Sequence, residues 1–182
     1  MNIFHLDSSP KNAAQYHVDS HAIKMILESA QLLCTAHRIL DGTQTKVNKT
    51  SKSGKVKLVT AYQLQDSHKD NLLYSVTHIN HPSAVWCRDN INNYNWLYEL
   101  FVHLCEEYTY RYGKQHKTEL VLRDLLANAP TNISSSCFTR PAQAMPDEYK
   151  HEDSVLAYRQ YYMGAKRHLA KWTKREIPYW WS

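Results

Sequence analysis

Residues 15–40, QYHVDSHAIKMILESAQLLCTAHRIL, carry the helical pattern around which the rest of the chain is organised. Apolar residues recur along this stretch at the three- and four-residue steps of one helix face. They are Val18, Ala22, Met25, Ile26, Leu32 and Leu33. Asp41-Gly42 follows, and glycine is a common helix terminator. The pattern predicts a long amphipathic helix that ends near Leu40.

The opposite side of this predicted helix has an unusual composition. His17, His21, Lys24 and Glu28 follow one another at steps of four, three and four residues. At about 100° per residue, these side chains fall within about 60° of one another on a helix. Two imidazoles, an amine and a carboxylate in register predict a catalytic site made of these four residues. The alternative is a solvated face with a Lys24–Glu28 pair and incidental histidines.

Two segments flank this helix in the sequence. Ser9-Pro10 reads as a helix cap followed by proline at the first helical position, so a helix begins there. It either runs on to Leu40 or breaks near residues 16–19, where Asp19-Ser20 offers a second cap. Residues 43–60 are polar and rich in lysine, which predicts a basic loop or a small β-hairpin.

The second half of the chain is also predicted to be helical. His81-Pro82 suits a helix start, because proline restricts the residue before it to extended geometry. The span 128–150 has three prolines but several apolar residues, which indicates an ordered, packed loop. The expected helices cover residues 82–112, 117–127 and 153–172. The sequence thus predicts a single all-α domain, residues 1–182, with the basic insertion near 43–60.

Polar residues outside the first helix are candidates for substrate binding. One group precedes the helix start at Pro82, where free N–H groups attract anions, and another lies in the irregular span 128–150. The candidates are His78, Asn80, His81, Gln143 and Asp147.

Charge and aromatic content favour a polyanionic partner. The formal net charge is +5, and 13 Tyr and 5 Trp accompany it. Residues 46–57 contain five lysines and residues 159–175 six Lys or Arg, and neither range has an acidic residue. Such clustering predicts binding to nucleic acid, and a merely basic surface is the alternative. Double-stranded DNA is the nucleic acid that we expect as the partner. The predicted DNA-binding residues are Arg88, Arg159, Lys166, Arg167, Lys171 and Lys174.

Other patterns exclude several classes of protein. The four cysteines form no C-x-x-C pair, which favours buried free thiols in a reducing cytoplasm. No apolar run approaches the ~20 residues that span a bilayer, and no secretion signal precedes the first helix. With 4 Gly and no Gly-rich phosphate loop, a dinucleotide-binding fold is not expected. We therefore expect a soluble cytoplasmic protein with no membrane partner and no cofactor.

Four stretches carry a resemblance to a known group of proteins. They are HAIKMILESAQLL (21–33), NHPSAVW (80–86), EEYTYRYGK (106–114) and AQAMPDEYK (142–150). Through them the chain resembles a family of uncharacterised proteins of tailed bacteriophages, nearly end to end. That resemblance implies the cytoplasm of an infected bacterial host as its location.

A more distant similarity is to the pyrimidine dimer DNA glycosylases. Shared features are the N-terminal MNIF, the early helix with His17, the His81-Pro82 step and the basic, aromatic C-terminal region. The similarity implies a helical enzyme that extrudes a nucleotide and attacks C1′ of its sugar with an amine, assisted by a helix carboxylate. Glu28, or else Asp19, would be this carboxylate.

The chain departs from that family at the amine. The best-known member of that family uses the α-amine of its second residue, a threonine, exposed by removal of the initiator methionine, whereas this chain has Met1-Asn2. Lys24, one helical turn from Glu28, is the alternative amine. Without an amine, Glu28 would activate a water molecule instead.

The function predicted from the sequence is therefore a DNA-base-acting enzyme, an N-glycosylase or a modifier of damaged or unusual bases. One alternative is a metal-dependent enzyme acting on nucleotides or nucleic acid. His17 and His21 would bind its metal, completed by Glu28, His78 or His81. A second alternative is a non-catalytic DNA-binding protein.

Overall fold

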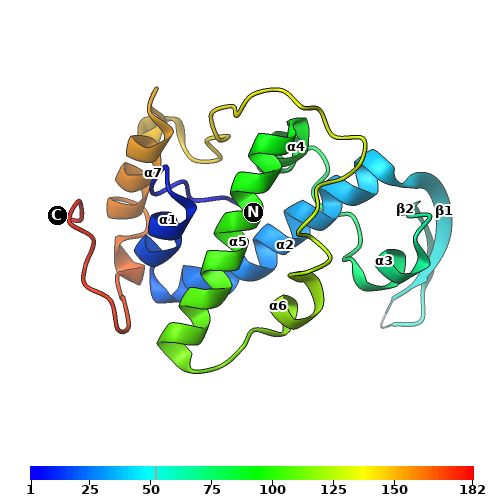
Figure 1. Ribbon diagram of the computed structural model, residues 1–182, viewed down its shortest axis with the longest axis horizontal. Helices are drawn as coiled ribbons and strands as arrows, with labels where there is room; N and C mark the ends of the chain where they lie inside the picture. Colours follow the sequence, from blue (N-terminus) through cyan, green and yellow to red (C-terminus); the bar gives the residue numbers. More distant parts are fainter. Residues whose placement is uncertain (52) are drawn as a thin grey trace.

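The structure, a computed structural model, describes residues 1–51 and 53–182. It consists mostly of helices, with a small two-stranded sheet at one end (Figure 1). The helices are α1 (Pro10–Tyr16), α2 (Asp19–Asp41), α3 (Ser67–Leu72), α4 (Pro82–Asp89), α5 (Ile91–Tyr112), α6 (Lys117–Leu122) and α7 (Ser154–Met163). Two 3-10 turns cover Asp147–Tyr149 and Arg167–Leu169, and the strands are β1 (Thr43–Thr50) and β2 (Val56–Gln63).

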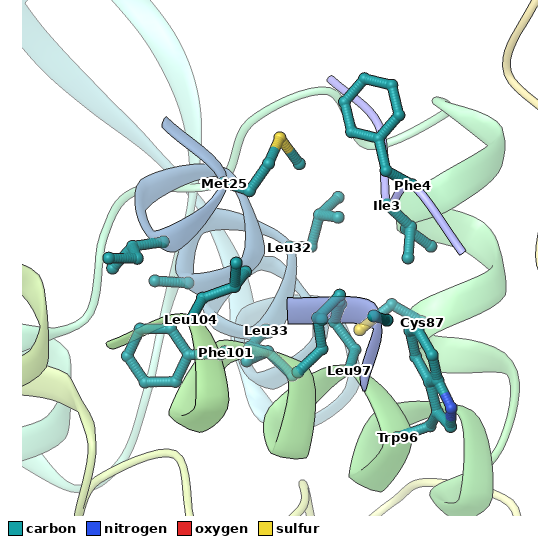
Figure 2. Close-up of a cluster of buried hydrophobic side chains, with 14 of the residues drawn as sticks. Ile3, Phe4, Met25, Leu32, Leu33, Cys87, Trp96, Leu97, Phe101 and Leu104 are labelled. Carbon is teal, nitrogen blue, oxygen red and sulfur yellow. The ribbon is translucent and has the colours of Figure 1, made fainter. Parts of the chain in front are cut away.

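The hydrophobic core lies between α2 and α5, which cross at the centre of the molecule (Figure 1). Figure 2 shows side chains of both helices meeting there, with Ile3 and Phe4 of the N-terminal segment beside them. The six apolar residues that the helical pattern placed on one side of α2 are all fully buried. The predicted apolar side of this helix is therefore confirmed, and α2 ends at Asp41, with Gly42 as the cap that follows it.

The first helix does break, between Tyr16 and Asp19. Arg111 of α5 makes this break possible, because its guanidinium donates to the carbonyls of His17 and Gln15, each at 2.9 Å. The same guanidinium lies 2.9 Å from a carboxylate oxygen of Asp19. The carbonyl groups that lose their helical hydrogen bonds at the break are thus paired with the buried Arg111 guanidinium. His17 consequently lies outside α2, and the predicted four-residue stripe is not continuous.

Of the two alternatives for residues 43–60, the hairpin is correct, so the chain is mostly α rather than purely α. β1 and β2 pair antiparallel, from Thr43↔Gln63 to Thr50↔Val56. Arg38 of α2 fastens the hairpin and the segment after it to the helices. Its guanidinium donates to the carbonyls of Tyr62 at 2.7 Å and of Leu73 at 2.8 Å.

The predicted helix 82–112 is two helices, divided at Asn90. Asn90 has extended backbone angles (φ −155°, ψ 164°), and its side chain accepts a hydrogen bond from the main-chain nitrogen of Asn93. The Asn93 side chain donates to the carbonyl of Trp86, which would otherwise accept the helical bond from residue 90. Local side-chain hydrogen bonding therefore outweighs the apolar periodicity here.

The predicted helices at residues 117–127 and 153–172 are both shorter than expected. α6 ends at Leu122, and α7 ends at Met163. At Gly164 the chain packs against Tyr149, whose hydroxyl oxygen lies 2.6 Å from the position a Cβ would take. The residues after Gly164 then turn back across the molecule, where the Trp172 indole donates to the carbonyl of Tyr16 at 2.9 Å. None of the helices in the described ranges has the length and apolar character needed to cross a membrane.

Candidate active site

The N-terminal segment lies along the side of α2 that carries His21 and Glu28. The main-chain nitrogen of Asn2 donates to Oε2 of Glu28 at 3.2 Å. Two residues on, the ring of Phe4 stacks on the imidazole of His21, with centroids 4.5 Å apart. The segment therefore covers one part of this helix side and directs its main chain at Glu28.

The side chain of Asn2 fixes this arrangement. Its amide nitrogen donates to the carbonyl of Ala144 at 2.9 Å. Its amide oxygen accepts from the hydroxyl of Tyr158 at 2.7 Å and from the main-chain nitrogen of Ile3 at 2.8 Å. Asn2 is buried, so each of these bonds replaces one to water. The irregular segment before α7 thus holds the N-terminal segment through a main-chain carbonyl.

Phe4 has a backbone conformation that is unusual for a large side chain. Its φ is 53°, in the left-handed region that bulky L residues avoid. Packing of its ring against His21 and edge-on against Tyr162, at 5.1 Å, holds it there. Strained residues of this kind cluster at sites where geometry is imposed by the surrounding structure.

Glu28 and Lys24 form an ion pair beside the N-terminal segment. Lys24 Nζ lies 3.2 Å from Oε1 of Glu28, while Oε2 accepts from the Asn2 main chain. The Glu28 side chain is only 13% exposed, whereas that of Lys24 is 64% exposed. A shielded carboxylate is therefore held between a fixed N–H group and a lysine that reaches into solvent.

His17 and His21 occupy different surroundings from Lys24, contrary to the predicted cluster of four. His17 is fully buried, and its Nδ1 lies 2.6 Å from the carbonyl of Ala13. His21 is buried too, with Nδ1 2.6 Å from the hydroxyl of Tyr162. Burial lowers the pKa of His17 to about 3 and that of His21 to about 4. With these pKa values both rings are neutral near pH 7, and both pack against Phe4, with centroids 6.1 Å away for His17 and 4.5 Å away for His21. Nδ1 of each ring is bound to a protein group, whereas the buried Nε2 of His17 has no hydrogen-bond partner.

His81 borders the site at the start of α4. Its Nδ1 accepts from the main-chain nitrogen of Ser83 at 3.2 Å, so His81 is the cap of that helix. Burial lowers its pKa, and Glu28 is near enough to oppose that effect. His78 is exposed, has a left-handed φ of 49°, and accepts the main-chain hydrogen bond of His81 at 2.9 Å. Asn80, between them, is exposed.

Gln143 and Asp147 have local partners rather than contacts with Glu28. Gln143 makes paired hydrogen bonds with the main chain of His151, and Asp147 forms an ion pair with Lys150 at 2.7 Å. The carbonyl of Ala144 is the group of this segment that reaches Asn2.

The five predicted DNA-binding residues within the expected helix 153–172 and just after it do not share one helix, because α7 ends at Met163. Arg88 donates to the carbonyl of Ile79 at 2.7 Å, and Arg159 forms an ion pair with Asp7 at 3.0 Å. These two arginines are held in place by protein groups. Lys166, Arg167, Lys171 and Lys174 follow α7, and of these Arg167, Lys171 and Lys174 are exposed.

Within residues 1–51 and 53–182, no three His, Cys, Asp or Glu side chains are grouped as a metal site would require. The residues that sequence reasoning missed are Asn2, Phe4 and Tyr158. Their sequence signal is weak, since contacts of Asn2 with Ala144 and Tyr158 join positions more than 140 residues apart. Comparisons with protein-family models, curated proteins and solved structures find no match to this chain.

Proposed function

We propose that this protein is a DNA-base-acting enzyme, an N-glycosylase for damaged or unusual bases, with Glu28 and Lys24 as its catalytic residues. The observation that supports this most is the position of the Glu28 carboxylate. It is shielded from water, held by the Asn2 main chain, and 3.2 Å from a lysine amine that is itself accessible. His81 is proposed to bind the substrate at the edge of the site.

The pair has the groups that glycosidic bond cleavage needs. The Lys24 amine, after giving a proton to Glu28, attacks C1′ of the sugar, and the C1′–N bond to the base breaks. The base leaves with the bonding electron pair and takes up the proton that the alkylated Lys24 nitrogen releases. Glu28 returns its proton to the ring oxygen as the sugar opens to an imine with Lys24, and water then hydrolyses that imine. Extrusion of the nucleotide precedes these steps, because C1′ is not accessible within a base stack.

The test is incubation with duplexes that carry one modified base each, such as a pyrimidine dimer, uracil or an alkylated purine, followed by borohydride reduction. We expect a covalent protein–DNA adduct that maps by mass spectrometry to Lys24. Glu28→Gln should abolish base release while leaving duplex binding within about twofold. Glu99→Gln, an exposed carboxamide variant on α5, is the matched control and should keep full activity.

Each other outcome has a defined meaning. Base release without an adduct would mean that Glu28 activates a water molecule and that Lys24 orients the Glu28 carboxylate. An adduct on the N-terminal peptide would move the nucleophile to the α-amine. Duplex binding without release of any base would contradict the enzyme and support a DNA-binding protein.

A further inference from the structure

We propose that the β1–β2 hairpin is a second DNA-binding element, a two-stranded ribbon that enters the major groove of the duplex held at Glu28. That the partner is DNA rests on the proposed function. That the hairpin binds a polyanion is argued from its own charge, exposure and dimensions. Residues 43–63 contain no acidic residue. Lys46, Lys49, Lys55 and Lys57 are all exposed.

The register of the hairpin places like charges against each other. Lys49 pairs directly with Lys57, and Lys55 lies just before β2. Like charges directly opposite in an antiparallel pair destabilise it. The repulsion between these lysines destabilises the isolated hairpin, and binding to a row of phosphates would offset it.

The outward side of the ribbon carries apolar residues as well. Because side chains alternate along a strand, Val56 and Leu58 share one side of β2, and Lys46 lies on the same side of β1. Val56 is 60% exposed and Leu58 is 64% exposed. This aliphatic side suits the floor of a DNA groove, where methyl groups and base edges lie between two rows of phosphates. Lys49 and Lys57 lie on the other side of the ribbon, from which their long side chains reach past the strand edges towards the phosphates.

The dimensions agree with this partner. A strand of eight residues is about 26 Å long, and the major groove, about 12 Å wide, admits a two-stranded ribbon. The hairpin follows the end of α2, at the opposite end of the molecule from the C-terminal segment (Figure 1). The 13 residues from Glu28 to Asp41 correspond to about 20 Å of helix, or roughly six base pairs along the duplex. One duplex can therefore reach both regions.

The experiment measures duplex affinity against salt concentration by fluorescence anisotropy. Full-length wild type is compared with the triple variant Lys46→Gln, Lys49→Gln, Lys57→Gln. Three lost phosphate contacts should lower the slope of log K against log salt by about 2.7 and weaken binding up to roughly 100-fold near 0.15 M salt. The matched control replaces three other exposed lysines, Lys11, Lys114 and Lys117, by glutamine and should change neither value as much.

A second variant separates groove contact from charge. Leu58→Ala should weaken binding severalfold with an unchanged salt slope, whereas Leu120→Ala, an equally exposed leucine on α6, should bind as wild type. If the hairpin triple variant and the Lys11, Lys114 and Lys117 control have the same salt slope, the hairpin inference is overturned and the proposed function is not affected. A hairpin-dependent slope without base release would contradict only the proposed glycosylase. Failure of the wild type to bind duplex DNA would overturn both.

Discussion

The ring of Phe4 stacks on the imidazole of His21, with ring centroids 4.5 Å apart and planes 18° from parallel. This contact joins the N-terminal segment to α2 just before the Lys24–Glu28 pair. His21, which the sequence suggests as a catalytic residue, therefore packs against Phe4, the residue with the left-handed backbone conformation. The consequences for stability and activity can be measured separately.

Phe4→Ala should destabilise the fold, because it removes a buried ring and its stacking contact with His21. We expect a loss of about 3–5 kcal/mol in the free energy of unfolding, measured with urea. Phe138→Ala, which removes a half-exposed ring, should cost far less. A loss below 1 kcal/mol for Phe4→Ala would show that the N-terminal segment is not anchored by this ring.

Lys24→Gln should separate activity from stability. The Lys24–Glu28 pair lies at the surface on its lysine side, and pairs of this kind contribute about 0–1 kcal/mol. We therefore expect an unchanged urea midpoint together with loss of the borohydride adduct. A strongly destabilised Lys24→Gln protein would mean that the pair is structural.

Stability should fall as the pH drops below about 6.5. Burial lowers the pKa of His5, His21 and His37 to about 4 and that of His17 to about 3. In the unfolded chain these residues bind protons near pH 6.5, so between pH 6.5 and 4 the unfolded state binds more protons than the folded state. The stabilisation is complete above pH 6.5 and is lost towards pH 4, by up to about 1.4 kcal/mol per pH unit for each histidine.

Urea unfolding at several pH values checks this window. His21→Gln removes one titrating group while leaving a hydrogen-bonding side chain near Tyr162, so its pH slope should be shallower by about one proton. His68→Gln changes an exposed histidine and should keep the wild-type slope. Equal slopes for all three proteins would contradict the assignment of His21 as a neutral, buried group.

Arg111→Met should be among the most damaging single substitutions. The Arg111 side chain is fully buried and contacts Glu107 at 2.6 Å, Asp19 at 2.9 Å and the carbonyls at the α1–α2 break. Removing it leaves buried acceptors unpaired, which costs about 3–5 kcal/mol. Lys150→Met, at the exposed pair with Asp147, should cost far less. Similar values for the two variants in urea would show that the Arg111 network contributes little.

The sequence determined the parts of this protein that depend on local periodicity. The apolar side of α2 follows from residue spacing, and its end at Asp41 follows from the glycine at position 42. The helix start at Pro82 follows from the conformational limits that proline imposes. The sequence also predicted that Lys24 lies beside Glu28, because residues four apart on a helix are neighbours on its surface.

Tertiary structure decided the features that depend on groups distant in the chain. Arg111, more than 90 residues away, donates to the carbonyl of His17 at the break that removes His17 from α2. Burial against Phe4 and Tyr162 made His21 a neutral packing residue, although its spacing matched a catalytic stripe. Periodicity records which side of a helix is polar. Only the fold decides which polar groups on that side remain in contact with water, because that depends on what packs against them.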